Sequence, residues 1–317
     1  MNKDRFFLDG DGASREYLDV RDLRLAEYSK SYCEHLWTRY RPFADRYFLE
    51  DARFHFHQRF WEMYLAVTLL EWGIDLKKHS DEGPDFYYAA GRARVWIEAM
   101  ALSGGEGEDR VPEPQMGKFT RVPHEKIFLR YQSGYSDKRR QYLSALEKGI
   151  VSPTDTCIIA LNVRRVPHAA FGDTLPFAAR AFYPIGPLTV SVPRDDRDVS
   201  ESFYALRGSI HKLNGSEVGT KTFLDDPTSQ FCSGVIESVV DCANFTELFG
   251  QDFKFIHNRM ARVPLNDNVT SHVHQYEYSD DDRIVHAEPL IRSPRDEHYV
   301  DVIQRMRKEK GSDANLG

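Results

Sequence analysis

Apolar residues recur at helical spacing over residues 53–72, which form the clearest element that the sequence predicts. Gly73 follows directly, at a position where helices commonly end. An earlier amphipathic helix is expected around residues 25–36, and Pro42 would end it. The apolar stripes consist of Phe56, Phe60, Tyr64 and Val67 in the later helix and of Leu25, Tyr28, Tyr32 and Leu36 in the earlier one.

Three short strands are predicted after the clear helix, at Ile74–His79, Asp85–Tyr88 and Arg94–Met100. A turn at Ala90–Arg92 would join the second strand to the third. Because side chains alternate along a strand, the third has two distinct faces. One face carries Val95, Ile97 and Ala99, and the other carries Trp96, Glu98 and Met100.

A loop rich in glycine and proline is predicted over residues 103–123. It is followed by a strand at Ile127–Gln132 and by a helix over Asp137–Lys148, capped by Ser136. The apolar run Thr156–Val163 is typical of a strand buried on both faces. In the second half of the chain, the pattern favours strands at 186–192, 232–240 and 252–257 and a helix at Glu201–His211.

No linker interrupts the chain, which favours one domain with elaborations over two domains. The expected parts are a helical N-terminal extension, a core, a C-terminal elaboration packed on the core and a flexible tail, at residues 1–50, 51–165, 166–302 and 303–317.

Composition narrows the class of protein. The 317 residues are 41% hydrophobic, 13% aromatic and 29% charged, which is typical of a globular protein. The net charge of −7 argues against a protein dedicated to coating nucleic acid, although a local basic groove is compatible with it. The four cysteines lack metal-site spacing and are expected to be free thiols. With neither a signal peptide nor a membrane-spanning stretch in the sequence, a cytoplasmic location is expected.

Three acidic residues stand out against apolar surroundings. Glu62 lies in the clear helix, Asp85 opens the second predicted strand, and Glu98 lies near the end of the third. A hairpin joining these strands would bring Asp85 and Glu98 side by side. Carboxylates grouped in this way suit Mg²⁺, which prefers oxygen ligands.

These features resemble the PD-(D/E)xK nuclease superfamily, which has restriction-endonuclease-like and RecB-like folds. The matching residues are Glu62, Pro84-Asp85 and Glu98-Ala99-Met100, within about 110 residues of the chain. The resemblance implies an α/β fold with an αβββαβ core, in which a mixed central sheet is flanked by helices. It also implies Mg²⁺ or Mn²⁺ held by Asp85, Glu98 and Glu62, and hydrolysis of phosphodiester bonds in DNA.

The sequence departs from the family pattern at Met100, which occupies the position of the usual lysine and cannot donate a hydrogen bond. In some members of the superfamily the lysine lies on the next helix, where this chain has Lys138, followed by Gln141 and Tyr142. Lys138 is therefore the fourth predicted catalytic residue. Nearby basic residues predict a surface for nucleic-acid phosphates, made of Arg130, Arg139 and Arg140.

Structural interpretations remain open for each of these residues. Pro84-Asp85 also suits a simple turn, Glu62 could pair with Arg59, and Lys138 could belong to a solvated basic face. His55 and His57 point to different faces of a helix and are expected to be structural. His272 and His274 would share one face of a strand, but a third metal ligand is not evident from the sequence.

The leading hypothesis is a metal-dependent nuclease, with the loop at 103–123 as a flap that contacts substrate. The rival hypothesis is a catalytically inactive member of the same fold that binds protein or nucleic acid. Met100, the acidic charge and the absence of recognisable chemistry over residues 164–317 favour the rival. In either case, the second half of the chain is the expected interface for a protein partner or a second copy.

Overall fold

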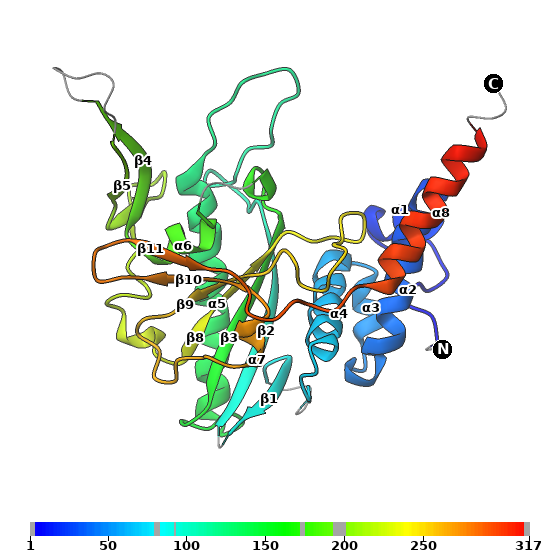
Figure 1. Ribbon diagram of the computed structural model, residues 1–317, viewed down its shortest axis with the longest axis horizontal. Coiled ribbons are helices and arrows are strands. Elements are labelled where there is room, and N and C mark those ends of the chain that lie inside the picture. Colours follow the sequence, from blue (N-terminus) through cyan, green and yellow to red (C-terminus); the bar gives the residue numbers. More distant parts are fainter. Residues whose placement is uncertain (1–3, 79–82, 92, 172–174, 193–200, 314–317) are drawn as a thin grey trace.

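A mixed seven-stranded sheet forms the centre of the protein, in the order β1-β2-β3-β8-β9-β10-β11 (Figure 1). The computed structural model describes residues 4–78, 83–91, 93–171, 175–192 and 201–313. The pairs β2–β3, β3–β8 and β9–β10 are parallel, and β1–β2, β8–β9 and β10–β11 are antiparallel. The sequence prediction of an α/β fold with a mixed central sheet flanked by helices is confirmed.

The sheet strands are β1 (Phe86–Ala90), β2 (Ala93–Ser103), β3 (Thr156–Arg165), β8 (Cys232–Ser238), β9 (Lys254–His257), β10 (His274–Tyr278) and β11 (Ile284–Ala287). Two smaller sheets pair β4 (Ile185–Ser191) with β5 (Glu201–Leu206) and β6 (Ser209–His211) with β7 (Glu217–Gly219). The helices are α1 (Arg15–Asp22), α2 (Glu27–Tyr40), α3 (Phe48–Ala52), α4 (Phe56–Glu71), α5 (His124–Glu147), α6 (Phe177–Phe182), α7 (Asn268–Ser271) and α8 (Glu297–Asp313).

Helices cover both faces of the sheet, and each face has its own hydrophobic core. On one face, Val95, Ile97 and Ala99 of β2 pack in a core with α2, α3 and α4. On the other face, Trp96 and Leu102 pack in a core with α5 and α6. The two-faced pattern predicted for this strand is therefore confirmed, because alternate side chains enter opposite cores.

Strand β3 lies between β2 and β8, and its first eight residues are all buried. This confirms the strand predicted from the apolar run Thr156–Val163. The four cysteines are buried free thiols, as expected. The strands predicted at 186–192, 232–240 and 252–257 correspond to β4, β8 and β9. The second half of the chain thus supplies four strands to the same central sheet.

The strand predicted at Ile127–Gln132 and the helix start predicted at Ser136 are both wrong, because one helix, α5, spans His124–Glu147. Gly134 lies in the middle of this helix, between the predicted strand and the predicted cap. Its actual role is close packing, since a Cβ added at Gly134 would lie 2.5 Å from Leu102 Cδ2 and 3.2 Å from Met100 Sδ. The missing side chain lets α5 lie close against β2.

The helix predicted at Glu201–His211 is also wrong, because these residues form strands β5 and β6. Apolar residues three or four apart, such as Phe203, Leu206 and Ile210, fit a helical period in a short segment, although here they lie on two strands.

Two further expectations differ from the structure. Of the strand predicted at Ile74–His79, only an isolated bridge from Lys77 to Tyr87 forms, and His79 lies outside the described residues. Helix α8 runs through Asp313, whereas a flexible tail was expected from residue 303; residues 314–317 lie outside the described part. Within the described ranges, the helices are too short or too polar to cross a membrane.

Replacing Gly134 with alanine should destabilise the protein. In an ordinary helix interior this change stabilises by about 1 kcal/mol, but overpacking against β2 should reverse the sign and cost about 1–3 kcal/mol. Chemical denaturation of the single variants and of Gly134→Ala with Leu102→Ala would measure this. The Leu102→Ala change should recover part of the loss at residue 134. If the stability losses of the two single variants simply add up in the double variant, the close-packing explanation is wrong.

Candidate functional site

The candidate site lies where β1 stops covering the edge of β2. The pairing of β1 with β2 ends at Phe86 and Ile97, and the register continued by one residue places Asp85 opposite Glu98. In place of a strand hydrogen bond, the Asp85 carboxylate accepts one from the backbone N–H of Ala99, with 2.7 Å between Oδ2 and N. The Asp85 side chain thereby takes the place of the backbone carbonyl that a longer β1 would offer to β2.

Gln58 of α4 continues this substitution along β2. Its amide oxygen accepts a hydrogen bond from Ala101 N at 2.7 Å, and its amide nitrogen donates to Ala99 O at 3.2 Å. The same nitrogen donates to Glu62 Oε1 at 2.9 Å. Gln58 was not predicted from the sequence. Its position four residues before Glu62, on the same helix face, could have indicated a contact between the two side chains.

Glu62 is buried, with 4% of its surface exposed. Arg59 Nη1 lies 2.8 Å from its Oε2, so the ion pair considered from the sequence forms. Burial raises the pKa of the Glu62 carboxyl to about 7, and the neighbouring Asp85 carboxylate contributes to the rise, while Arg59 opposes it. The Asp85 carboxylate thus disfavours the negative charge of Glu62.

Glu98 is equally buried and meets Lys138 of α5, whose Nζ lies 2.7 Å from Glu98 Oε2. Burial raises the pKa of the Glu98 carboxyl to about 7 against the opposing effect of the Lys138 ammonium, and Asp85 and Glu62 add to the rise. Burial alone would lower the pKa of Lys138, but the carboxylates of Glu98 and Asp85 outweigh it and raise this pKa. Lys138 therefore stays charged.

The structure thus brings Glu62 of α4, Asp85 just before β1, Glu98 of β2 and Lys138 of α5 into one electrostatic cluster. Lys138 approaches from the middle of α5 rather than from the first turn of a helix. Carboxylate oxygens suit a divalent cation, but within the described part of the chain Glu62, Asp85 and Glu98 do not place one oxygen each within 4.8 Å of one another, so an ion bound by all three would require their side chains to move. Each carboxylate already has a partner: Arg59 for Glu62, the Ala99 N–H for Asp85, and Lys138 for Glu98.

A cavity of about 700 Å³ adjoins the cluster between β2 and α5. Glu98 and Met100 line it from the strand, and Arg140, Gln141 and Lys148 line it from the helix. Met100 therefore faces the cavity as an apolar wall. The neighbouring Tyr142 is buried and stacks on Phe231, with ring centroids 4.7 Å apart, so it belongs to the core and not to this cavity.

The three arginines predicted to bind phosphates each have a different partner in the structure. Arg140 lines the cavity and pairs with Asp137. Arg130 donates to Ser103 O at 3.0 Å and lines a separate pocket, and Arg139 pairs with Asp226 at 3.0 Å. Of the three, Arg140 is therefore the one positioned to contact a ligand beside Glu98.

The histidines considered from the sequence have different surroundings in the structure. His57 is buried, and its Nε2 lies 3.0 Å from Asn162 Oδ1, which supports the structural role expected for it. His272 precedes strand β10 and stacks on Trp72, so the expectation that His272 and His274 share a strand face is wrong. His274 lies instead beside His286 and Glu288, at a place far from Glu98 in the sheet order.

Comparison with known proteins gives no relative: no family model, no curated protein and no solved structure matches this chain.

Replacing Lys138 with methionine should leave Glu98 buried without its cation. We expect a loss of about 3 kcal/mol of unfolding free energy, since breaking one half of a buried ion pair leaves the Glu98 carboxyl either charged without a partner or forced to bind a proton. Adding Glu98→Gln to this variant should recover a substantial part of the loss. Denaturant titration of both single variants and the double variant measures the coupling, and a coupling near zero would mean that the pair does not form in solution.

Proposed function

We propose that this protein is a metal-dependent phosphodiesterase acting on nucleic acid, with DNA as the expected substrate. The single observation that carries the proposal is the approach of Lys138 to Glu98, beside Asp85, from a helix that follows the acidic strand pair. The resemblance to PD-(D/E)xK nucleases implies this placement for a lysine displaced from its usual strand position. Met100 occupies that usual position.

The order of elements around the site supports the same proposal. Helix α4 is followed by the hairpin β1–β2, helix α5 and the parallel strand β3. In an αβββαβ core a first strand would precede this hairpin. At that position this chain has an isolated β-bridge between Lys77 and Tyr87, so we propose that the bridge is what remains of the first strand. The acidic pair lies on the hairpin, and the lysine lies on the crossover helix.

The side chains suit distinct roles in hydrolysis. Asp85 and Glu98, with Glu62 behind them, would hold Mg²⁺ or Mn²⁺, which would lower the pKa of water and offset charge on the scissile phosphate. Lys138 supplies a fixed positive charge for the phosphate oxygens as negative charge develops. Gln58 keeps Glu62 oriented and fixes the edge of β2 to α4.

The cavity beside Glu98 suits a phosphate-bearing ligand. Arg140 and Lys148 place cationic side chains on its helix wall, opposite the carboxylate. Loop residues 104–123 leave β2 just beyond the site, and Figure 1 shows this loop projecting from the body of the molecule. We propose that the loop contacts the strand of nucleic acid that passes the cavity.

A second candidate function is supported by a specific observation, the ion pairs Lys138–Glu98 and Arg59–Glu62. Both cations neutralise carboxylates that a metal would need. A protein that kept these pairs closed would use the same cavity to bind nucleic acid or protein without cleaving it.

Cleavage of labelled DNA in the presence of Mg²⁺ or Mn²⁺ separates the two functions. Asp85→Asn and Glu98→Gln should each reduce the rate by at least about 100-fold, and Lys138→Met by a similar factor, because metal and charge stabilisation are lost. Glu125→Gln, an exposed carboxylate at the start of α5, is the matched control and should retain activity. DNA binding without cleavage under all these conditions would favour the second function.

Metal binding at this site should strengthen as pH rises towards and past neutrality. Because the pKa values of Glu62 and Glu98 are raised to about 7, protons compete with the metal below that pH and are absent above it. One competing proton predicts roughly tenfold tighter Mn²⁺ binding at about pH 8 than at about pH 6. Calorimetric titration at both values measures this, with Glu98→Gln as the comparison. Affinity independent of pH would contradict the assignment of the ligands.

A further inference from the structure

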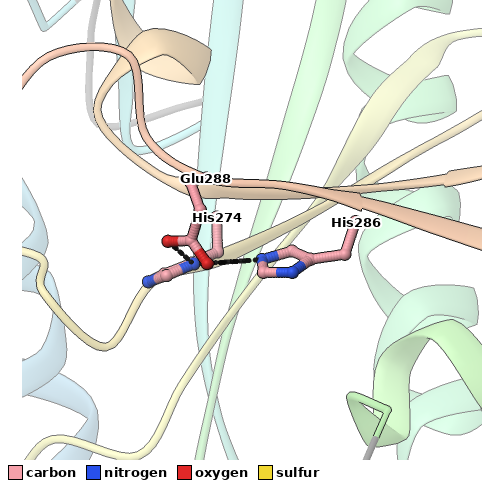
Figure 2. A group of neighbouring side chains, drawn as sticks. All are labelled: His274, His286 and Glu288. Atoms are coloured by element: carbon pink, nitrogen blue, oxygen red, sulfur yellow. Dashed lines mark hydrogen bonds and ion pairs between the residues drawn. The ribbon is translucent and has the colours of Figure 1, made fainter.

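The hairpin β10–β11 brings together two imidazoles and a carboxylate, side-chain types that ligate metals, away from the acidic cluster. Its register pairs Gln275 with Ala287 and Tyr276 with His286. Alternate residues of paired strands share a face, so His274, Tyr276, His286 and Glu288 all lie on one side of the hairpin. Figure 2 shows the imidazoles of His274 and His286 and the carboxylate of Glu288 turned towards one another.

The shortest distances between the three side chains, measured to both carboxylate oxygens of Glu288, are close to those of a tetrahedral metal site, and one ligand atom from each residue lies within 4.8 Å of the others. His274 Nδ1 lies 3.1 Å from His286 Nε2 and 3.2 Å from Glu288 Oε2, and His286 Nε2 lies 3.8 Å from Glu288 Oε1. Zinc binds nitrogen and oxygen at about 2.0–2.1 Å, for which the edge of a regular tetrahedron is about 3.3 Å. The donor atoms thus need only small shifts to surround one ion.

We propose that His274, His286 and Glu288 bind a divalent transition-metal ion of the zinc class. Two imidazoles and one carboxylate suit Zn²⁺, whereas Mg²⁺ and Ca²⁺ prefer oxygen donors throughout. The site is open, because the side chains of His274, His286 and Glu288 are 33%, 37% and 73% exposed. A fourth position therefore faces solvent, as it does in zinc sites that bind water or an exogenous ligand.

Neighbouring groups hold the ligands in place. Tyr276 stacks on His286, with ring centroids 4.7 Å apart and planes 18° apart. On the adjacent strand β9, Lys254 is the register partner of His274, but its ammonium pairs with Glu237 at 3.3 Å. That pairing offsets a cation that would otherwise oppose metal binding.

The site is separate from the acidic cluster. Four strand spacings lie between β2 and β10, a separation of roughly 19 Å across the sheet. The inference therefore does not rest on the proposed nuclease function. It concerns a different ion and a different set of residues.

Titration of ZnCl₂ into the full-length, chelator-treated protein tests the site. In the Glu98→Gln variant, which removes a ligand of the acidic cluster, we expect one Zn²⁺ to bind per chain, and Co²⁺ in its place to give the intense visible absorption of tetrahedral coordination. His286→Ala and His274→Ala should each weaken Zn²⁺ binding by more than about tenfold. Glu288→Gln preserves shape while removing the charge, and it should weaken binding without unfolding the hairpin, as circular dichroism would verify.

Two controls make the result specific. His55→Ala removes an exposed histidine of the N-terminal half and should leave Zn²⁺ binding unchanged. Glu98→Gln should likewise leave the component of Zn²⁺ binding that depends on His274 and His286 unchanged, since the acidic cluster is distant. Absence of Zn²⁺ binding would overturn the proposal and leave the contact as a hydrogen bond between imidazoles. Binding that survives both His274→Ala and His286→Ala would overturn it equally.

Discussion

The candidate site is built around backbone N–H and C=O groups on one edge of β2 that no neighbouring strand in the described part of the chain pairs. Strand β2 extends beyond its partner β1, and its backbone groups past Ile97 still require donors and acceptors. Asp85 and Gln58 meet part of that demand with side chains in place of backbone. A carboxylate is thereby fixed in the plane of the sheet, where Glu62 approaches from the α4 face and Glu98 from β2 itself. The acidic cluster thus occupies a place where regular pairing stops.

Much of the sheet could be predicted from the sequence, because its signals were local. The alternation along β2 and the apolar run of β3 each identified a strand and its faces, and the helix before Gly73 was equally clear. The prediction failed where tertiary contact decided the outcome. The predicted strand ended at Gln132 and the predicted helix began after Ser136, whereas the missing side chain of Gly134, between them, lets one continuous helix α5 pack closely on β2. Periodicity alone contains no information about that contact.

The candidate site was predictable in part for the same reason. Glu62 and Glu98 were visible as acidic residues in apolar segments, and Lys138 was suggested by the family resemblance. Gln58 was not identified, because an amide on a helix carries no signal of the strand edge that it completes. The group at His274, His286 and Glu288 was also not identified: it depends on the register of a hairpin, which brings together residues 12 positions apart, as it does for His274 and His286. Two histidines at 272 and 274 gave a misleading pattern, since a strand begins only at the second.

The close approach at Gly134 also bears on the reach of the lysine. Gly134 and Lys138 are four residues apart and lie on the same side of α5, towards β2. A lysine side chain has a fixed length, so the separation of helix and strand determines whether its ammonium can touch a carboxylate on that strand. A larger residue one turn earlier would move the helix outward and draw the charge away from Glu98. Gly134 thus sets the separation of α5 from β2, and through it the distance between the Lys138 ammonium and the carboxylates of the acidic cluster.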